Sequence, residues 1–312
     1  MNRRIFLASL GAACGAWGTA TPLSRFKLGA ISDGFSADFE EALKTMKSYG
    51  LAWVEIRHVY GIYNTETSPT QIQQMKNLLD KYQFRVSVID SALYKCTLPG
   101  TKPVTGEKDS YPYASQMDLL KRACDRAHAL GATKVRGFSF WRVADPGQLT
   151  ERIATELGKA AEVANADGMR LVIENEEICN AATGHELARI LAKAPAPNLG
   201  ANWDVGNGYW HGETSFPDGY QALDKKRIWH SHLKGVQCSG NFQNCSETLA
   251  GKGQNDLVGQ LKSFLQDGYR ETMSLECEFE MPGVSHLETS KRSLTGLLQA
   301  MTIAAGATGA QR

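Results

Sequence analysis

A single (β/α)₈ TIM barrel is the architecture that three features of this 312-residue chain indicate. Eight short apolar runs alternate with eight segments whose apolar residues recur at helical spacing, which is typical of a parallel sheet covered by helices. No linker interrupts the alternation, and about 290 residues suit one closed barrel. The first run is followed by Ser32, Asp33 and Gly34, without the Gly-rich phosphate turn that is usual in open doubly wound sheets.

The predicted strands are short apolar runs, and the helices carry apolar residues every three to four positions. In chain order the strands cover residues 26–32, 53–59, 85–91, 134–140, 170–176, 199–205, 228–236 and 272–280. Ser68 and a following proline open the second helix, while Gly50, Gly131 and Gly168 close the first, third and fourth. The helices cover residues 39–49, 68–82, 114–130, 146–166, 183–193, 218–223, 256–266 and 285–305.

The N-terminus has the pattern of an export signal. Arg3 and Arg4 precede an apolar stretch at 5–17, and small residues follow at 18–20. The segment Arg-Arg-x-Phe-Leu resembles the twin-arginine signal of bacteria. We therefore expect a signal peptide at 1–20, a barrel at 21–312 and a periplasmic location; the alternative is a flexible tail or a buried first helix.

Composition and charge exclude several classes of protein. Hydrophobic residues make up 42% of the chain and charged residues 21%, which is enough apolar material for a sizeable core. Lys and Arg number 34 against 33 Asp and Glu, so the net charge of +1 does not favour nucleic-acid binding. No apolar run reaches about 18 residues, and we expect no membrane span. The sequence does not decide whether the chain forms a homo-oligomer.

Six cysteines remain after the predicted signal, in a compartment where disulfides persist. Cys238 and Cys245 lie close together in a polar stretch and form either a local disulfide or two solvent-facing thiols. Cys277, within a predicted strand, is expected to be an inert buried thiol. The sequence lacks a Cys-x-x-Cys pair, so a thiolate zinc site or thioredoxin-like chemistry finds no support.

Acidic and histidine side chains mark the ends of the last four predicted strands. Since side chains alternate along a barrel strand and chemistry gathers at the C-terminal strand ends, we expect them to meet at the barrel mouth. Carboxylates inside apolar strands are costly to bury unless they are paired or bound to metal. The residues are Glu174 and Glu176, then Asn202, Asp204 and Asn207, then His230, His232 and Lys234, and last Glu276, Glu278 and Glu280.

Oxygen ligands with one imidazole suit a divalent cation such as Mn²⁺, Mg²⁺, Co²⁺ or Zn²⁺. The competing interpretation is a set of ordinary strand-end residues in salt bridges with Lys234 or Arg170. Glu, Asp, His and Glu in strand order favour one metal ion.

The segments around these residues resemble the metal-site strands of the xylose-isomerase-like barrel superfamily. They are Leu-Val-Ile-Glu174-Asn, Asn-Trp-Asp204-Val-Gly-Asn207, His232-Leu-Lys and Ser-Leu-Glu276, and Trp-Val-Glu55-Ile is similar to its second strand. The resemblance implies a metal site of Glu174, Asp204, His232 and Glu276. It also implies that the two glutamates act as an acid–base pair. One removes the proton next to a carbonyl and the other returns a proton, and the metal stabilises the enediolate between these steps.

The chain departs from that pattern in the region expected to bind substrate. Glu176 and Asn207 stand where relatives often carry histidine, and Gly235 stands where they commonly carry an acid. His230 could replace or supplement His232, and Lys234 either binds substrate or neutralises Glu276. Further candidates for substrate binding are Arg57 and Arg136, whose alternative role is structural pairing. Trp141 either stacks against a sugar or packs in the core or against a loop.

Three functions follow as hypotheses. The first is an exported metal-dependent isomerase or epimerase of a sugar or related keto-polyol. The second is a lyase or hydrolase of keto-glycosides that uses the same enolising step, and the third is a carbohydrate-binding barrel without catalysis. An endonuclease-like role is disfavoured by the export signal, the balanced charge and the presence of only seven histidines.

Overall fold

The computed structural model describes residues 22–194 and 196–307, and its centre is an eight-stranded parallel sheet rolled into a barrel. The predicted signal, residues 1–20, lies outside the described residues. The sheet order is β1-β12-β9-β8-β7-β6-β5-β2, and a parallel bridge between Ile31 and Glu55 joins its two edges. The predicted (β/α)₈ barrel is confirmed.

The barrel strands follow the predicted positions closely and are mostly shorter. They are β1 (Lys27–Ala30), β2 (Trp53–Ile56), β5 (Arg85–Leu93), β6 (Lys134–Gly137), β7 (Arg170–Glu174), β8 (Leu199–Asp204), β9 (Ile228–Leu233) and β12 (Thr272–Leu275). Gly29 permits the last contact of the ring, because a Cβ there would lie 2.7 Å from the carbonyl oxygen of Trp53 at the start of β2.

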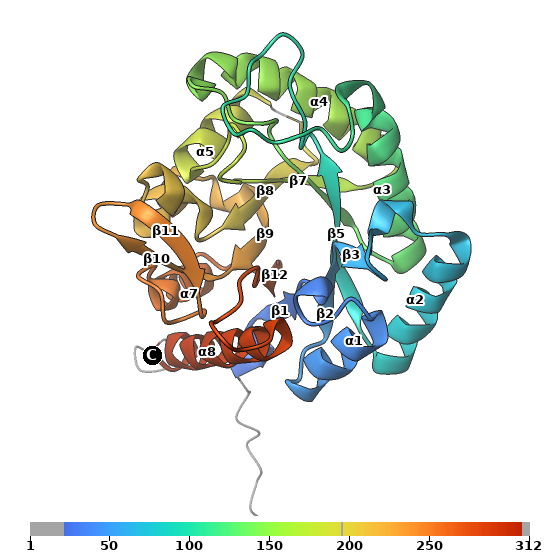
Figure 1. The fold of residues 1–312 in the computed structure, drawn as a ribbon, viewed down its shortest axis with the longest axis vertical. Coiled ribbons are helices and arrows are strands. Elements are labelled where there is room, and N and C mark those ends of the chain that lie inside the picture. The colour runs from blue at the N-terminus through green and yellow to red at the C-terminus, as the bar shows by residue number, and fades with distance from the viewer. Residues whose placement is uncertain (1–21, 195, 308–312) are drawn as a thin grey trace, which may run out of the picture.

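Helices surround this ring, as Figure 1 shows. They are α1 (Phe39–Ser48), α2 (Pro69–Tyr82), α3 (Gln116–Leu130), α4 (Thr150–Ala166), α5 (Gly184–Lys193), α6 (Tyr220–Ala222), α7 (Leu257–Gln266) and α8 (His286–Ala307). Capping boxes at Ser68 and Thr183 begin α2 and α5, so local hydrogen bonds place these helix starts. Within the described ranges, no helix is both long and apolar enough to cross a bilayer.

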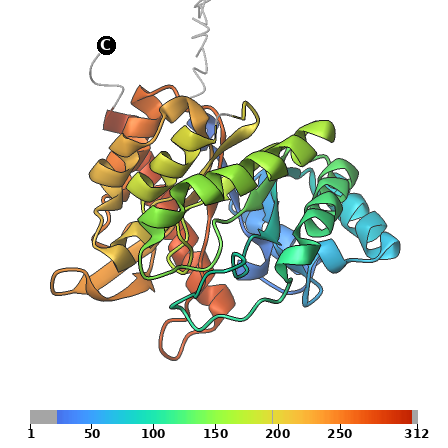
Figure 2. The ribbon, with the colours of Figure 1, turned by 90° about the horizontal axis from the view of Figure 1, so that it is seen from above.

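Two hairpins were not predicted. The strands β3 (His58–Val59) and β4 (Ile62–Tyr63) pair after β2, and β10 (Gly235–Ser239) pairs with β11 (Gln243–Thr248) after β9. The seventh predicted strand, 228–236, therefore merges two strands that Lys234 separates. In Figure 2 the β10–β11 hairpin, the loop between β5 and α3 and the loop before α8 project from one side of the barrel.

The β10–β11 hairpin is cross-linked by a disulfide between Cys238 and Cys245, the bonded one of the two alternatives that the sequence left open. Cys277 is buried, as expected, but it follows β12 and is not part of the strand. The reason is that the register of β12 with its neighbours runs only from Thr272 to Leu275.

Candidate metal centre and adjoining cavity

Four side chains meet where the strands β7, β8, β9 and β12 reach the barrel mouth. Glu174 and Asp204 are the last residues of β7 and β8, His232 lies near the end of β9, and Glu276 directly follows β12. One ligand atom from each lies within 4.8 Å of every other. The parallel register causes this, because it sets His232 beside Asp204 on one side and beside Ser274 on the other.

His232 lies at the centre of the cluster and contacts it through one ring nitrogen. Its Nδ1 is 2.9 Å from Glu174 Oε1, 3.3 Å from Glu276 Oε2 and 4.0 Å from Asp204 Oδ2. The other nitrogen, Nε2, lies 2.9 Å from Glu55 Oε1. The sequence left open which histidine belongs to this cluster, and the structure places His232 there.

His230 has the same orientation but lies one layer deeper in the barrel. Its Nε2 is 2.8 Å from Glu55 Oε2, and its Nδ1 is 2.8 Å from Thr272 Oγ1. Glu55 therefore contacts both histidines, and it is fully buried. In the sequence, Glu55 belongs to a segment that resembles the family but has no role assigned by that resemblance; the signal that could have found it is a carboxylate between the apolar residues Val54 and Ile56.

Hydrogen bonds hold Asp204 in one orientation. Its Oδ1 accepts from the backbone N–H groups of Gly206 and Asn207, at 2.8 and 2.7 Å. Its Oδ2 then faces the cluster. Among the described residues, neither Asp204 Oδ2 nor Glu276 Oε2 accepts a well-aligned hydrogen bond, although Lys234 Nζ lies 3.1 and 2.7 Å away. Both oxygens are thus available to a further cation.

Five buried carboxyl groups lie in and around the cluster, and buried cations offset them in part. Arg136 and Lys234 lie among them, and Arg57 contributes only in part because it also pairs with Asp33. Burial raises the pKa of Asp204 to about 7 and that of Asp90 well above its usual range, despite these cations. The carboxyl groups are Glu55, Asp90, Glu174, Asp204 and Glu276.

These residues fit a divalent cation on two grounds. Three carboxylates and one imidazole are a donor set for a hard or borderline ion. A cation could also take the place of the proton on His232 Nδ1: burial lowers the pKa of His232, but Glu174, Glu55 and Glu276 raise it well above its usual range.

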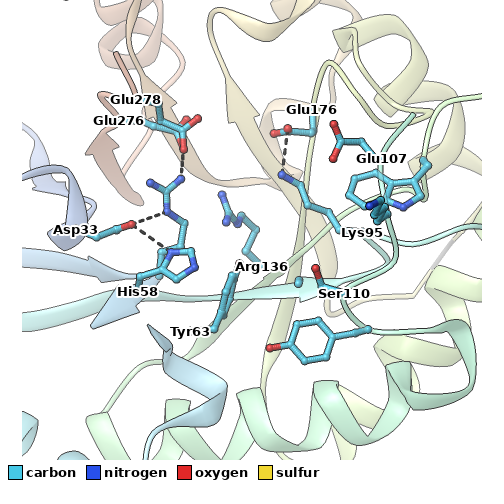
Figure 3. A pocket seen from close by; sticks show the side chains of 15 residues that line it. Asp33, His58, Tyr63, Lys95, Glu107, Ser110, Arg136, Glu176, Glu276 and Glu278 are labelled. Atoms are coloured by element: carbon cyan, nitrogen blue, oxygen red, sulfur yellow. Dashed lines mark hydrogen bonds and ion pairs between the residues drawn. The ribbon is translucent and has the colours of Figure 1, made fainter. Parts of the chain in front are cut away.

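A cavity of about 510 Å³ opens beside the cluster, and Glu276 is part of its wall. Figure 3 shows Lys95 pointing toward Glu176, with a separation of 3.1 Å between Lys95 Nζ and Glu176 Oε1. Arg57 Nε bonds Asp33 at 3.1 Å, and its guanidinium also pairs with Glu276 and Glu278. The other lining residues are His58, Tyr63, Ala92, Glu107, Lys108, Ser110, Tyr111, Arg136 and Trp141.

The substrate-binding candidates divide into two groups. Arg57, Arg136 and Glu176 line the cavity. His230, Asn207 and Lys234 are buried and lie outside its lining. Lys234 Nζ contacts Asn207 Oδ1 at 3.3 Å and the two cluster carboxylates Asp204 and Glu276, which matches the neutralising alternative.

The loop between β5 and α3 supplies part of the cavity wall. Asp109 anchors it: its Oδ1 accepts from Trp141 Nε1 at 2.8 Å and from the backbone N–H of Thr97 at 2.9 Å. This anchoring holds the Trp141 ring at the cavity wall, where it is also buried against Phe138 and Cys179, so the structure is compatible with both roles that the sequence left open.

Comparison with known proteins gives a family match over most of the chain. A profile of the xylose isomerase-like TIM barrel family matches residues 43–297. No protein with a curated description matches the sequence.

Solved structures share the fold at low sequence identity. The chain is similar to a structure titled IOLI protein with a binding zinc atom, with 14% identity, a TM-score of 0.70 and coverage of 89% of this chain and 98% of that one. An L-ribulose 3-epimerase is 15% identical, with a TM-score of 0.63 and coverage of 91% of this chain and 97% of that one. The probable 3-DHS dehydratase AsbF of Bacillus anthracis is 13% identical, with a TM-score of 0.67 and coverage of 89% of this chain and 99% of that one.

Proposed function

Because the chain belongs to the xylose isomerase-like TIM barrel family, we propose that it is a metal-dependent enzyme that isomerises or epimerises a sugar or related keto-polyol. The observation that carries the proposal is the meeting of Glu174, Asp204, His232 and Glu276 within 4.8 Å, next to a polar cavity. The similarity to an L-ribulose 3-epimerase and to a zinc-containing structure supports it.

Glu174, Asp204, His232 and Glu276 would hold the ion, which we propose to be Mn²⁺, Mg²⁺, Co²⁺ or Zn²⁺. When bound, a divalent ion polarises a substrate carbonyl and lowers the cost of negative charge that develops on its oxygen. The hydrogen bonds to Asp204 Oδ1 and the contacts of His232 keep the donor atoms in place beforehand.

Glu174 and Glu276 are the acid–base pair. They approach His232 Nδ1 from the end of β7 and from the residue after β12, and we place them on opposite sides of a substrate bound between them. One carboxylate takes the proton from the carbon next to the carbonyl, and the electron pair of that C–H bond moves to form the enediolate. The other carboxyl group returns a proton to carbon, and the carbonyl re-forms.

Other residues of the cavity orient the substrate. The guanidinium groups of Arg57 and Arg136 and the Lys95–Glu176 pair offer donors and acceptors for hydroxyl groups. The indole of Trp141 offers a flat apolar surface for the C–H face of a sugar ring.

Solvent exchange tests the proposal. Metal-loaded protein is incubated in D₂O with a panel of ketoses, and NMR follows deuterium entering the carbon next to the carbonyl and the appearance of an isomer. Exchange in the unaltered protein and its loss in Glu276→Gln support the proposal. A protein that binds the ketose and the metal without any exchange would instead be the carbohydrate-binding barrel.

A second candidate is a lyase or hydrolase of keto-glycosides. Its support is the size of the cavity, since about 510 Å³ lies within the roughly 300–1,000 Å³ of pockets that enclose drug-sized ligands. The similarity to a probable dehydratase is consistent with elimination after enolisation. Release of an aglycone from a keto-glycoside identifies this activity, and isomer formation alone excludes it.

We also propose that residues 1–20 direct export to the periplasm. The support is the Arg3-Arg4 pair before an apolar segment. Full-length protein should appear in the periplasmic fraction with a shortened N-terminus, and replacing both arginines with lysine should keep it in the cytoplasm. Periplasmic accumulation that does not depend on these arginines contradicts a twin-arginine route.

A further inference from the structure

We propose that Glu55 is a positioning residue of the metal centre, which fixes His232 with Nδ1 facing the other three ligands. The inference rests on the metal centre of the proposed function and adds a residue outside the ligand set. Its basis is the bridging position of Glu55, whose two oxygens each contact a different buried histidine, at 2.9 Å for His232 and 2.8 Å for His230.

A chain of hydrogen bonds reaches Glu55 from the far end of the barrel. Lys134 at the start of β6 has donors only, and its Nζ lies 3.0 Å from Thr272 Oγ1. The Thr272 hydroxyl receives that bond and gives its single proton to His230 Nδ1, 2.8 Å away. His230 therefore carries its proton on Nε2 and donates it to Glu55 Oε2.

The Glu55 carboxylate also determines which ring nitrogen of His232 donates to it. An ionised Glu55 only accepts hydrogen bonds, so the proton between Glu55 Oε1 and His232 must belong to the ring nitrogen Nε2. Once a cation replaces the proton that the carboxylates hold on Nδ1, the lone pair of the imidazole is on Nδ1, the nitrogen that faces Glu174, Asp204 and Glu276. Metal-binding histidines generally donate their second ring N–H to an acceptor of this kind, which fixes the tautomer.

The opposite tautomer of His232, with its proton on Nδ1, is unfavourable in free energy at this position. It would set the Nε2 lone pair against a carboxylate oxygen in a fully buried place, where no solvent relieves the repulsion. The amide nitrogen Nδ2 of Asn202 also lies 3.1 Å from Nε2, and Asn202 Oδ1 accepts no bond from any described residue. Rotation of that amide would give Nε2–H a second acceptor, so Asn202 is compatible with the same tautomer.

The substitution Glu55→Gln tests whether Glu55 acts by accepting hydrogen bonds from both histidines or only by filling space. Glutamine has the shape of glutamate but only one acceptor oxygen, so it cannot accept from His230 and His232 together. The matched control is Glu186→Gln, which neutralises a part-buried carboxylate that pairs with Arg142 outside this chain of bonds. Glu174→Gln, which removes a ligand, is the reference for loss of the centre.

Two measurements on the full chain test the inference, with Zn²⁺ as the probe. In calorimetry we expect Glu55→Gln to weaken Zn²⁺ binding about 10–100-fold, the usual effect of losing such a partner, and Glu186→Gln to leave it unchanged. In ¹⁵N-histidine NMR of the Zn²⁺-loaded protein we expect His232 to be coordinated through Nδ1 with a proton on Nε2. Unchanged affinity in Glu55→Gln, or coordination through Nε2, overturns the inference.

The outcomes also separate this inference from the proposed function. If the unaltered chain binds no Zn²⁺, both fail. If it binds Zn²⁺, and Glu174→Gln abolishes binding but Glu55→Gln does not weaken it, only the role of Glu55 fails. If Glu55→Gln does not fold, Thr272→Val cuts the same chain one bond earlier. We then expect weaker binding and a mixed His232 tautomer, and an unchanged spectrum and affinity overturn the inference.

Discussion

Replacing Lys234 with methionine should destabilise the metal-free protein strongly and the metal-loaded protein much less. Lys234 is 4% exposed, and its ammonium lies 3.1 Å from Asp204 and 2.7 Å from Glu276. Methionine fills a similar volume without charge, so the change removes the cation and keeps the packing.

The magnitude follows from the burial of these groups. Removing one partner of a buried ion pair costs about 3–5 kcal/mol, because a charge stays behind without compensation. At about 2 °C per kcal/mol for a chain of this length, Lys234→Met should lower the Tm by about 6–10 °C without metal. Zn²⁺ at 100 times its Kd stabilises the unaltered protein by about 2.7 kcal/mol. The gain should be larger in Lys234→Met, where the ion also replaces the lost charge.

Thermal unfolding with and without Zn²⁺ measures this difference. Arg142→Met is the control, because Arg142 pairs with the part-buried Glu186 at 2.9 Å, outside the metal cluster and the hydrogen-bond chain that leads to Glu55. We expect the control to lose stability without any extra gain from Zn²⁺. Equal Zn²⁺-induced Tm shifts in Lys234→Met and the unaltered protein would refute the reasoning.

Three further predictions concern the scaffold. Gly29→Ala should lower stability by about 1–3 kcal/mol in denaturant unfolding, since its Cβ would lie 2.7 Å from a carbonyl oxygen of β2; an unchanged midpoint contradicts this. Burial disfavours the ionised form of Glu186, but its bonds to Arg142 and to backbone N–H groups outweigh this and lower its pKa. The resulting stability is present above the unfolded pKa of about 4.3 and is lost as the pH falls below it, so Glu186→Gln should flatten the acid limb of a stability–pH curve. Replacing Cys238 and Cys245 together with serine should cost about 2–3 kcal/mol of hairpin stability, seen as faster amide exchange in β10 and β11 and not elsewhere.

Sequence periodicity predicted the barrel because each strand and helix carries its own local signal. The four clustered side chains could be predicted to meet for the same reason: parallel strands bring their carboxyl ends to one rim. Glu174, Asp204 and His232 lie on or near the last residues of their strands. Glu276 lies beyond its strand, yet close enough to the end of β12 for the argument to reach it.

What periodicity did not predict depends on contacts between distant segments. The β10–β11 hairpin was merged with β9 because the run from Leu233 to Val236 looks continuous, and only the pairing across Cys238 and Cys245 separates the strands. The role of Glu55 depends on two histidines about 175 positions later, at 230 and 232, which no local pattern connects.

Crystals of the protein grown with Zn²⁺ and measured at the zinc absorption edge test the metal centre itself. We expect one anomalous peak about 2.0–2.2 Å from an oxygen of Glu174, Asp204 and Glu276 and from Nδ1 of His232. A peak at another place, or a fully ordered cluster without one at saturating Zn²⁺, contradicts the shared ion on which the proposed chemistry depends.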